Sequence, residues 1–544
     1  MPSNKEIAAD FHLLGKLSDL HGENPFKGKS YANAAFRIER LEQPLDALTP
    51  ERISSIDGIG PAIAEKIAVV LKGEEIPALT KLLEKTPEGI LDIMQIKGLG
   101  PKKVRTIWHD LNIESVGELL YACYENRLTS LKGFGAKTQD QVIRSIEFMQ
   151  QNRNKFHYAT AEAVFELVKE QLEQTGLTQK IDMTGPLRRR CEVVTAVDLL
   201  VSTDDEGTLR SRLLTLFPDI STESPFSFTG PGGVPVQLHL ASSEDWVHEL
   251  FISTGPDEHT AKFTPDKNVP SEEDIYTIAG SPYVVPELRD LDPQFPPAPD
   301  DLLKVKDLKG ILHVHSTYSD GLHTLEEMAT RCKELGYEYL GICDHSQSAF
   351  YANGLKADRI KKQHEEIERL NEKLSPFVIF KGIESDILND GSLDYEDAVL
   401  ESFDFIVASV HSNLKMDKEK ATRRVLNAVC NPHTTILGHM TGRLLLSREG
   451  YPLDHEQIIE ACRDHGVVIE LNAHPYRLDI DWRWIPRCIE AGVKISVNPD
   501  AHQMDGLTDV RYGCLAGRKG GLLRSMTFNT QSAEEVGAFF KGRH

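Results

Sequence analysis

The chain has 544 residues, of which 40% are hydrophobic and 26% charged, and its net charge is −22. That length is enough for three or four domains, and the charge excludes a protein that is basic over its whole surface. The sequence shows no signal peptide and no apolar run near the roughly 18 residues of a membrane span. The eight cysteines form no CxxC pair, so we expect a cytoplasmic protein with free thiols and no membrane partner.

Residues 1–155 are expected to be helical, because apolar residues recur at helical spacing. One pattern occurs three times, in IDGIGPAIAEKI (56–67), IKGLGPKKVRTI (96–107) and LKGFGAKTQDQV (131–142). Gly-apolar-Gly before a helix allows close backbone approach and presents unpaired N–H groups to a phosphate. The pattern predicts helix-hairpin-helix motifs that bind DNA without reading its sequence. The predicted contact residues are Gly58, Gly60, Gly98, Gly100, Lys102, Lys103, Gly133 and Gly135.

Lys66 lies on the helix that follows the first glycine turn. One interpretation is a Schiff-base nucleophile for an abasic sugar, which would give this region a lyase activity. The other is an ordinary exposed lysine of a helix. The spacing favours neither.

Residues 156–289 alternate between strand and helix patterns. The stretch GPLRRRCEVVTAVDLLV (185–201) carries a glycine turn, an arginine pair and a hydrophobic strand with a single acid, Asp198. Nucleotidyl transfer with two metal ions needs at least two carboxylates to hold those ions. The stretch therefore has the outline of a nucleotidyltransferase site but only one of the acids such a site requires.

Residues 290–305 are rich in proline and acid, which predicts a stiff, solvated linker. Beyond it, seven apolar segments alternate with amphipathic helices, as βα units do. The segments begin at residues 310, 339, 378, 405, 435, 467 and 495. In a parallel barrel the carboxyl ends of the strands face one way, so polar residues placed there converge. These residues are His313, His315, Asp320, His345, Glu384, His411, His439, Asp500 and His502.

Imidazole and carboxylate ligands suit Zn²⁺, Mn²⁺ or Fe²⁺. His313 and His315 are two residues apart, as are Asp500 and His502, and side chains at that spacing share one face of a strand. Glu384 is suited to bridging two ions, as phosphate-ester hydrolysis requires. The alternative for any single histidine is a buried, hydrogen-bonded core residue, but nine such residues at corresponding positions favour a metal centre.

Residues 306–544 resemble a PHP (polymerase and histidinol phosphatase) domain, through HVHSTYSDG, CDHS, GIESDIL, SVHS, LGHMTGRLLLSREGYPLD, ELNAHPYRLDIDW and NPDAH. The resemblance implies a seven-stranded, distorted TIM-like barrel with three divalent ions. The implied groups are His313, His315, Glu384 and Asp500 for one ion, Glu384, His411 and His439 for the second, and Asp320, His345 and His502 for the third. Arg443 and Arg477 are predicted phosphate contacts, because a guanidinium group matches phosphate oxygens.

In the order of its parts the whole chain is similar to the bacterial family X DNA polymerases. The resemblance implies five parts: a helical DNA-binding or lyase-like domain (1–85), a helical fingers- or thumb-like region (86–155), a nucleotidyltransferase palm and thumb (156–289), the linker (290–305) and the PHP domain (306–544). The polymerase site keeps Gly185, Arg189 and Asp198. It departs from the family pattern at Pro186, which replaces a serine, and at Ala196 and Gln237, which replace two acids.

These observations predict a DNA repair enzyme that is a metal-dependent phosphodiesterase: a 3′→5′ exonuclease, with abasic-site endonuclease or 3′-phosphatase action as further options. Its polymerase half would no longer polymerise and would bind gapped, nicked or 3′-end DNA. Three alternatives stay open: an active gap-filling polymerase with a proofreading nuclease, a phosphatase for a small metabolite, and a DNA-binding scaffold without catalysis. The sequence does not identify a protein partner.

Overall fold

The structure, a computed structural model, describes residues 2–41, 43–221, 223, 225–266 and 268–543. The chain divides into two compact units, Met1–Arg153 and Asn154–His544. Among the described residues, every helix is too short or too polar to cross a lipid bilayer.

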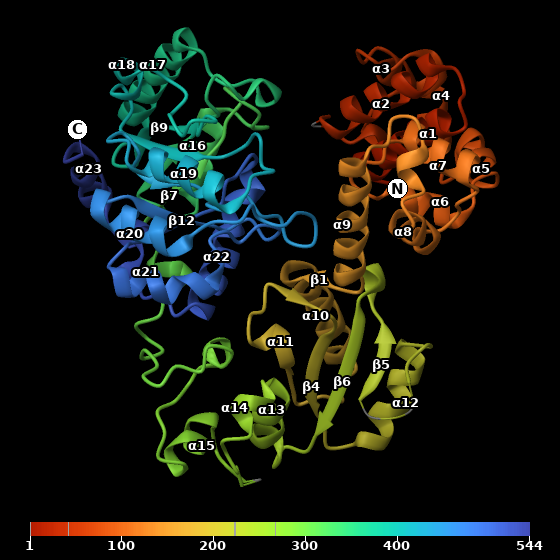
Figure 1. The fold of residues 1–544 in the computed structure, drawn as a ribbon. Helices are drawn as coiled ribbons and strands as arrows, with labels where there is room; N and C mark the ends of the chain where they lie inside the picture. The colour runs from red at the N-terminus through yellow and green to blue at the C-terminus, as the bar shows by residue number, and fades with distance from the viewer. Residues whose placement is uncertain (1, 42, 222, 224, 267, 544) are drawn as a thin grey trace. The chain divides into compact units, whose positions relative to one another are not determined.

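The first unit consists of helices joined by short turns (Figure 1). Several helices begin with a proline, whose fixed φ suits the first helical position and whose missing N–H is not needed there. The apolar residues of each helix face one shared core, as Ile63 and Ile67 do in one helix and Val104 and Ile107 in another. The helices are α1 (Asn4–Leu20), α2 (Pro25–Glu39), α3 (Pro50–Ser54), α4 (Pro61–Leu71), α5 (Pro77–Leu83), α6 (Glu88–Met94), α7 (Pro101–Leu111), α8 (Val116–Tyr124) and α9 (Ala136–Asn152).

The second unit begins with a small mixed sheet in the order β2-β4-β6-β5, in which β4 and β6 run parallel and the outer pairs antiparallel. Val164 and Val168 of α10 pack with Leu199 and Val201 of β4 in one core. The elements are β1 (Phe156–His157), α10 (Tyr158–Glu173), β2 (Lys180–Met183), α11 (Gly185–Arg188), β3 (Val193–Val194), β4 (Val197–Ser202), α12 (Glu206–Leu216), β5 (Phe226–Thr229), β6 (Pro235–Ala241), α13 (Trp246–Thr254), α14 (Asp257–Thr260) and α15 (Glu272–Ile278).

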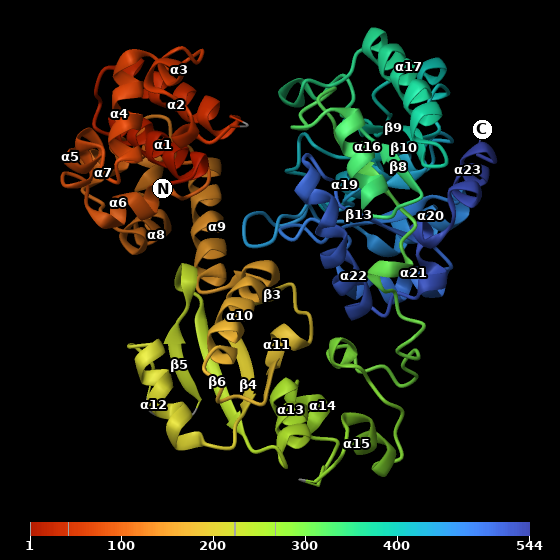
Figure 2. The same ribbon diagram turned by 180° about the vertical axis from the view of Figure 1, so that it is seen from behind.

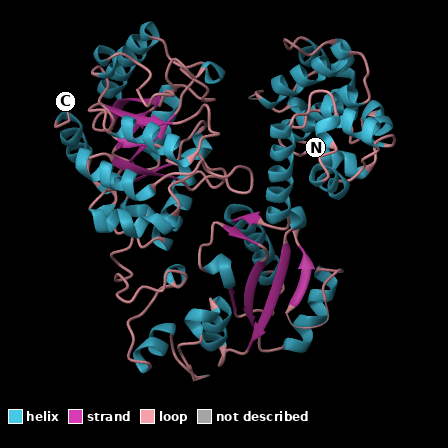
Figure 3. Ribbon diagram, in the orientation of Figure 1, coloured by secondary structure: helices cyan, strands magenta, loops and turns pink. Residues whose placement is uncertain are grey.

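The rest of the second unit contains a sheet of seven strands, all parallel to their neighbours and in chain order from β7 to β13 (Figure 3). A bridge between Val314 and Ala501 brings the two outer strands together, so the barrel is nearly closed. The seven predicted strands are confirmed. They are β7 (Gly310–Val314), β8 (Tyr339–Ile342), β9 (Val378–Asp386), β10 (Phe405–Ser409), β11 (Ile436–Leu437), β12 (Val468–Asn472) and β13 (Ile495–Asn498).

Helices that follow the strands cover the barrel, as the view from behind shows for α16, α17 and α22 (Figure 2). Parallel strands covered in this way are buried on both faces, which is why most of them read as continuous apolar runs. The helices are α16 (Leu325–Glu334), α17 (Ala357–Leu374), α18 (Asp397–Leu400), α19 (Lys418–Val429), α20 (His455–His465), α21 (Ile485–Ala491), α22 (Val510–Lys519) and α23 (Ala533–Lys541).

The segment 290–305 differs from the solvated linker that its composition predicted. Leu302 and Leu303 are fully buried, and Leu302 forms a β-bridge with Leu523. Asp290 accepts hydrogen bonds from Arg189 at 3.1 Å. The proline and acid content therefore predicts only the middle of the segment correctly. Its first residue, Asp290, forms an ion pair with Arg189, and near its other end Leu302 and Leu303 are buried.

Candidate functional site: three glycine turns, a lone palm acid and a metal centre

The three glycine turns of the first unit have the same backbone geometry. The first glycine of each pair is left-handed, with φ of 86° at Gly58, 94° at Gly98 and 90° at Gly133. The second glycine is the N-cap of α4, α7 or α9. A Cβ built on these N-cap glycines would meet no atom within 4 Å, so packing does not require glycine there. The open space is what a phosphate would occupy at a helix N-terminus.

The predicted contact lysines lie at the second turn. Lys103 donates a hydrogen bond of 3.3 Å to the Gly98 carbonyl, and its ammonium also lies over the Phe134 ring. Lys66 has the contacts of an ordinary helix residue: its ammonium donates to the Ala62 carbonyl at 3.1 Å. A Schiff-base role for Lys66 stays a prediction.

In the palm, Asp198 has no neighbouring carboxylate at the positions where two-metal chemistry needs them. Gln237 faces it across the β4–β6 register, and Ala196 is buried two residues before it. Burial raises the pKa of Asp198, an effect that His239 and Arg189 only partly offset. Asp198 lies in a cavity of about 500 Å³ whose lining also contains Asp257 and Glu258. The same lining contains Arg189 and His239, so acidic and basic side chains share the cavity.

The arginine pair beside this cavity is already engaged. Arg188 forms a two-pronged pair with Glu272, with N–O distances of 2.9 and 2.7 Å. Arg289, which is fully buried, also donates to Glu272 at 3.0 Å. Arg189 donates to Asp290 and to the Thr254 carbonyl. Both guanidinium groups therefore stabilise the palm internally.

The nine predicted ligands of the barrel converge on one cluster organised by three carboxylates. Glu384 lies at the centre, with His411 Nε2 at 3.1 Å, His439 Nε2 at 3.0 Å and His313 Nε2 at 3.4 Å from Oε1. Its other oxygen, Oε2, lies 2.9 Å from His345 Nδ1.

The other two carboxylates lie beside further imidazoles. Asp500 Oδ1 is 3.1 Å from His315 Nε2 and 3.6 Å from His313 Nε2. Asp320 Oδ1 is 3.4 Å from His502 Nε2 and 3.6 Å from His345 Nε2. Among the described residues, three groups lie close enough to hold one ion each: His315, Asp320, His345 and His502; His313, His315 and Asp500; and His345, Glu384 and His411. The last group contains His345 where the family resemblance implies His439, although His439 Nε2 also lies 3.0 Å from Glu384 Oε1.

These separations fit shared metal ions. Two ligands bonded at about 2.0–2.1 Å in a tetrahedral arrangement are about 3.3 Å apart, close to the distances in the cluster. Several of the ligand atoms are buried and have no hydrogen-bond partner among the described residues, including His313 Nε2, His315 Nδ1 and Glu384 Oε2. Buried polar atoms without partners are costly unless something else satisfies them. The residues present therefore fit divalent ions.

Charge in the cluster is strongly coupled. Burial alone would raise the pKa of Glu384, but His411, His313 and His345 outweigh it and hold that pKa well below its ordinary value. Burial lowers the pKa of His315 to about 3, with help from His502 and His345. The cluster thus keeps Glu384 ionised and His315 neutral, which are the forms that bind metal.

Ligand positions relative to the strands differ in two respects from the sequence prediction. Glu384 lies within β9 rather than at its end. β13 ends at Asn498, and Asp500 takes a left-handed conformation with φ 53°. Asp500 and His502 lie beyond the end of β13, so the alternation of side chains along a strand does not bring them to the same side. A tight turn, in which His502 Nδ1 lies 3.0 Å from the Asp500 carbonyl, brings them together.

Sequence reasoning missed a second layer of buried acids. Glu470 Oε1 lies 2.7 Å from His313 Nδ1, and Asp386 contacts His411 Nδ1. Asp344 accepts hydrogen bonds from Ser316 and from Ser319, which precedes Asp320. A carboxylate on the far nitrogen of a histidine fixes the ring and raises its basicity. Asp344 and Asp386 could have been suspected from the sequence, because each lies within two residues of a predicted ligand. No comparable sequence signal pointed to Glu470.

The two predicted phosphate-binding arginines differ. Arg477 is next to the cluster, with Nη1 3.5 Å from Asp500 Oδ2. The Arg443 guanidinium is engaged with Asp481 and with the carbonyls of Arg477 and Leu478. Arg477 is therefore the better placed of the two for a substrate phosphate.

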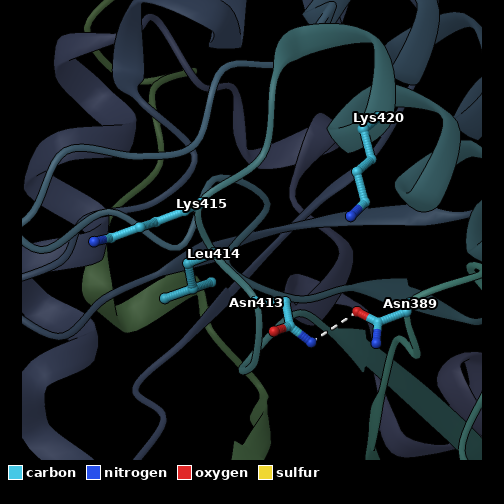
Figure 4. A pocket seen from close by; sticks show the side chains of 5 residues that line it. All are labelled: Asn389, Asn413, Leu414, Lys415 and Lys420. Atoms are coloured by element: carbon cyan, nitrogen blue, oxygen red, sulfur yellow. Dashed lines mark hydrogen bonds between the residues drawn. The ribbon is translucent and has the colours of Figure 1, made fainter. Parts of the chain in front are cut away.

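A surface pocket of about 500 Å³ lies on the loops that follow β9 and β10, the strands that lead to Glu384 and His411 (Figure 4). Asn413 donates a 2.8 Å hydrogen bond to Asn389 at its base, and the Lys420 side chain extends toward them from α19. Lys415 and Leu414 complete the lining. Amide and ammonium groups make this pocket suited to an anion.

Comparison with known proteins agrees with this architecture. Three family models match: a helix-hairpin-helix domain over residues 2–76, a SAM-like helix-hairpin-helix tandem over residues 90–147 and a PHP domain over residues 312–474. The DNA polymerase/3′-5′ exonuclease PolX of Bacillus subtilis (strain 168) is 32% identical over 567 residues, covering 99% of each chain.

About a third of the chain is also similar to shorter proteins. A probable phosphatase of Thermoanaerobacter sp. (strain X514) is 28% identical over 214 residues, which covers 36% of this chain and 80% of that protein. A probable phosphatase of Clostridium acetobutylicum is 27% identical over 208 residues, covering 35% of this chain and 78% of that protein.

Proposed function

The chain belongs to the PolX-type family X DNA polymerases, which join helix-hairpin-helix segments to a PHP domain, and from this premise we propose that it shortens DNA from 3′ ends by metal-dependent phosphodiester hydrolysis. The observation that carries the proposal is the complete nine-residue cluster around Glu384. Repair of gapped or nicked DNA is the process that such an activity serves. Abasic-site cleavage and 3′-phosphatase action are further reactions open to the same cluster, and the probable-phosphatase relatives favour the second.

Three divalent ions, Mn²⁺, Zn²⁺ or Fe²⁺, are proposed for the cluster, in the groups that the family resemblance implies. When bound, such ions supply the activated water and the charge neutralisation that phosphodiester hydrolysis requires. Arg477 is proposed to hold a non-bridging phosphate oxygen with its guanidinium group. The most exposed ligand is His502, at 37%, whereas His313 and His315 are fully buried, so the substrate enters from the side of His502 and Asp320.

The palm is proposed to bind DNA without extending it. Asp198 alone cannot hold two ions, and Arg189 is occupied by Asp290. The glycine turns are proposed to grip the DNA backbone, and Lys420 in the pocket beside the metal centre offers a further cation for it. Lyase action by Lys66 is a further possibility within this scheme.

The test is a nuclease assay with the full chain, Mn²⁺ and 5′-labelled gapped DNA. Stepwise shortening of the labelled strand is expected, with loss of activity in His313→Ala and little change in Lys66→Ala. Shortening that survives His313→Ala would contradict the assignment to the barrel. DNA left intact by the unmodified chain would favour a scaffold, or a phosphatase for a small metabolite.

A further inference from the structure

Two large aromatic side chains are exposed at the entrance of the metal centre. Phe350 is 84% exposed and Tyr351 is 69% exposed, although the same turn buries Ala349 and Ala352. The Tyr351 ring centre lies 6.0 Å from the ring centre of His345, a predicted ligand. Exposed aromatic rings occur elsewhere in the chain, as Phe26 at 82% and Phe295 at 85% show, so what distinguishes Tyr351 is its place beside a predicted ligand.

The turn that carries them is rigidly built. It follows β8 and forms a 3₁₀ helix over Phe350–Ala352. Ser348 donates a 2.7 Å hydrogen bond to Asp386, the acid that contacts His411, and its backbone N–H donates to Asp394 at 2.6 Å. Gly354 approaches the Ser346 carbonyl so closely that an added Cβ would lie 1.8 Å from it. These contacts hold the backbone of the turn in place beside the metal ligands.

We propose that Tyr351 is a stacking platform for the terminal base of a single-stranded DNA 3′ end, and that Phe350, next to it in the chain, is available to a neighbouring base. This inference rests on the proposed nuclease function and names the form of DNA that the site takes. Aromatic rings stack on any base, so the platform selects single strands and frayed ends without reading sequence. In a paired duplex the terminal base already stacks on its neighbour and is less available to Tyr351.

The charge around the entrance suits this mode of binding. The Asp320, Glu384 and Asp500 carboxylates lie among imidazoles, so the net charge of the cluster depends on protons and on bound ions. Stacking is indifferent to that charge and holds the base beside the cluster, while Arg477 lies 3.5 Å from Asp500 on the same cluster. The platform thus positions the nucleotide, and the ligand cluster carries the chemistry.

Tyr351→Ala is expected to raise KM for a single-stranded substrate by about 5- to 150-fold, the loss of one stacked base, with kcat little changed. Tyr351→Phe keeps the ring and is expected to restore KM. Phe295→Ala is the matched control, because Phe295 is 85% exposed but lies in the segment 290–305. A substrate whose 3′-terminal nucleotide lacks its base is expected to bind the unmodified chain and Tyr351→Ala equally.

Binding is measured separately with a phosphorothioate strand that carries 2-aminopurine at its 3′ end. Quenching of its fluorescence by the unmodified chain, reduced in Tyr351→Ala, is expected even if hydrolysis is absent, which separates the platform from the nuclease proposal. Unchanged KM and quenching in Tyr351→Ala would overturn the platform. An equal loss on the base-lacking substrate would overturn it as well, because the effect would not depend on a base.

Discussion

Asp198 in the palm and Glu384 in the barrel are both acids on a strand that pairs in parallel with its neighbour. Asp198 lies in β4 beside β6, and Glu384 lies in β9 beside β10, but the surroundings of the two carboxylates differ. Burial raises the pKa of Asp198, and the partners that offset it are His239 and Arg189. Burial also acts on Glu384, but imidazoles on both of its oxygens hold its pKa well below the ordinary range. Burial thus acts on both acids, but the pKa falls only at Glu384, where the fold supplies several imidazole neighbours.

The comparison is tested most strongly by removing each carboxylate in turn. Glu384→Gln is expected to lower nuclease activity by at least about 1,000-fold, because the bridging charge of the cluster is lost. Asp198→Asn is expected to leave that activity unchanged. Initial rates on 5′-labelled DNA check both. Equal losses in the two variants would mean that the palm takes part in the nuclease reaction.

Rebuilding the palm site is the converse experiment. Ala196→Asp with Gln237→Asp introduces two carboxylates near Asp198, one two residues before it, just ahead of β4, and one across the β4–β6 register. In a Glu384→Gln background, Mn²⁺ at about 100 times its Kd is expected to stabilise this variant by about 2–3 kcal/mol. Thermal unfolding with and without Mn²⁺ measures the gain. If Mn²⁺ stabilises the rebuilt variant no more than it stabilises the Glu384→Gln parent, the two missing acids are not the only reason that the palm fails to bind metal ions.

Glu470 tests whether the second layer tunes the ligands. Its oxygens accept hydrogen bonds from the His439 backbone N–H at 2.9 Å and from Asn498 at 3.1 Å, besides the contact with His313. Glu470→Gln is expected to weaken metal affinity by about 10- to 100-fold, with excess metal restoring activity. Calorimetric titration checks this against Glu490→Gln, whose side chain is 70% exposed. Unchanged affinity would leave Glu470 a purely structural role.

Metal affinity is expected to fall as pH falls. Burial lowers the pKa of His411, but the carboxylates of Glu384 and Asp386 outweigh burial and raise that pKa to about 10. Burial also lowers the pKa of His502, and Asp320 and Asp500 raise it to about 9. In the ion-free protein these imidazolium groups are stabilised at neutral pH, and that stabilisation is lost as pH rises through 9 to 10. A metal ion must therefore displace these protons when it binds. For each proton displaced, the apparent metal affinity is expected to fall about tenfold for every pH unit that the pH is lowered. Calorimetry in two buffers of different ionisation enthalpy detects the release, and pH-independent binding would refute it.

Much of the barrel was predictable, because apolar segments that alternate with helices define its seven strands, and the candidate ligands lie in or shortly after those strands. Three features of the site could not be predicted, because each depends on backbone geometry or on contacts between segments far apart in the sequence. They are the turn at Asp500, the contact of Glu470 with His313 and the ion pair of Arg443 with Asp481. The three glycine turns were readable because their geometry is local. The Tyr351 platform was not, because an aromatic pair in a sequence usually indicates core.

One reaction tests the central claim, that the working chemistry of this chain lies in the barrel and not in the palm. The purified full chain is incubated with Mn²⁺, 5′-labelled gapped DNA and all four deoxynucleoside triphosphates, and the labelled strand is resolved by length. We predict that the strand shortens, that shortening is lost in Glu384→Gln, and that no product is longer than the starting strand. Extension by the unmodified chain that disappears in Asp198→Asn would contradict the account.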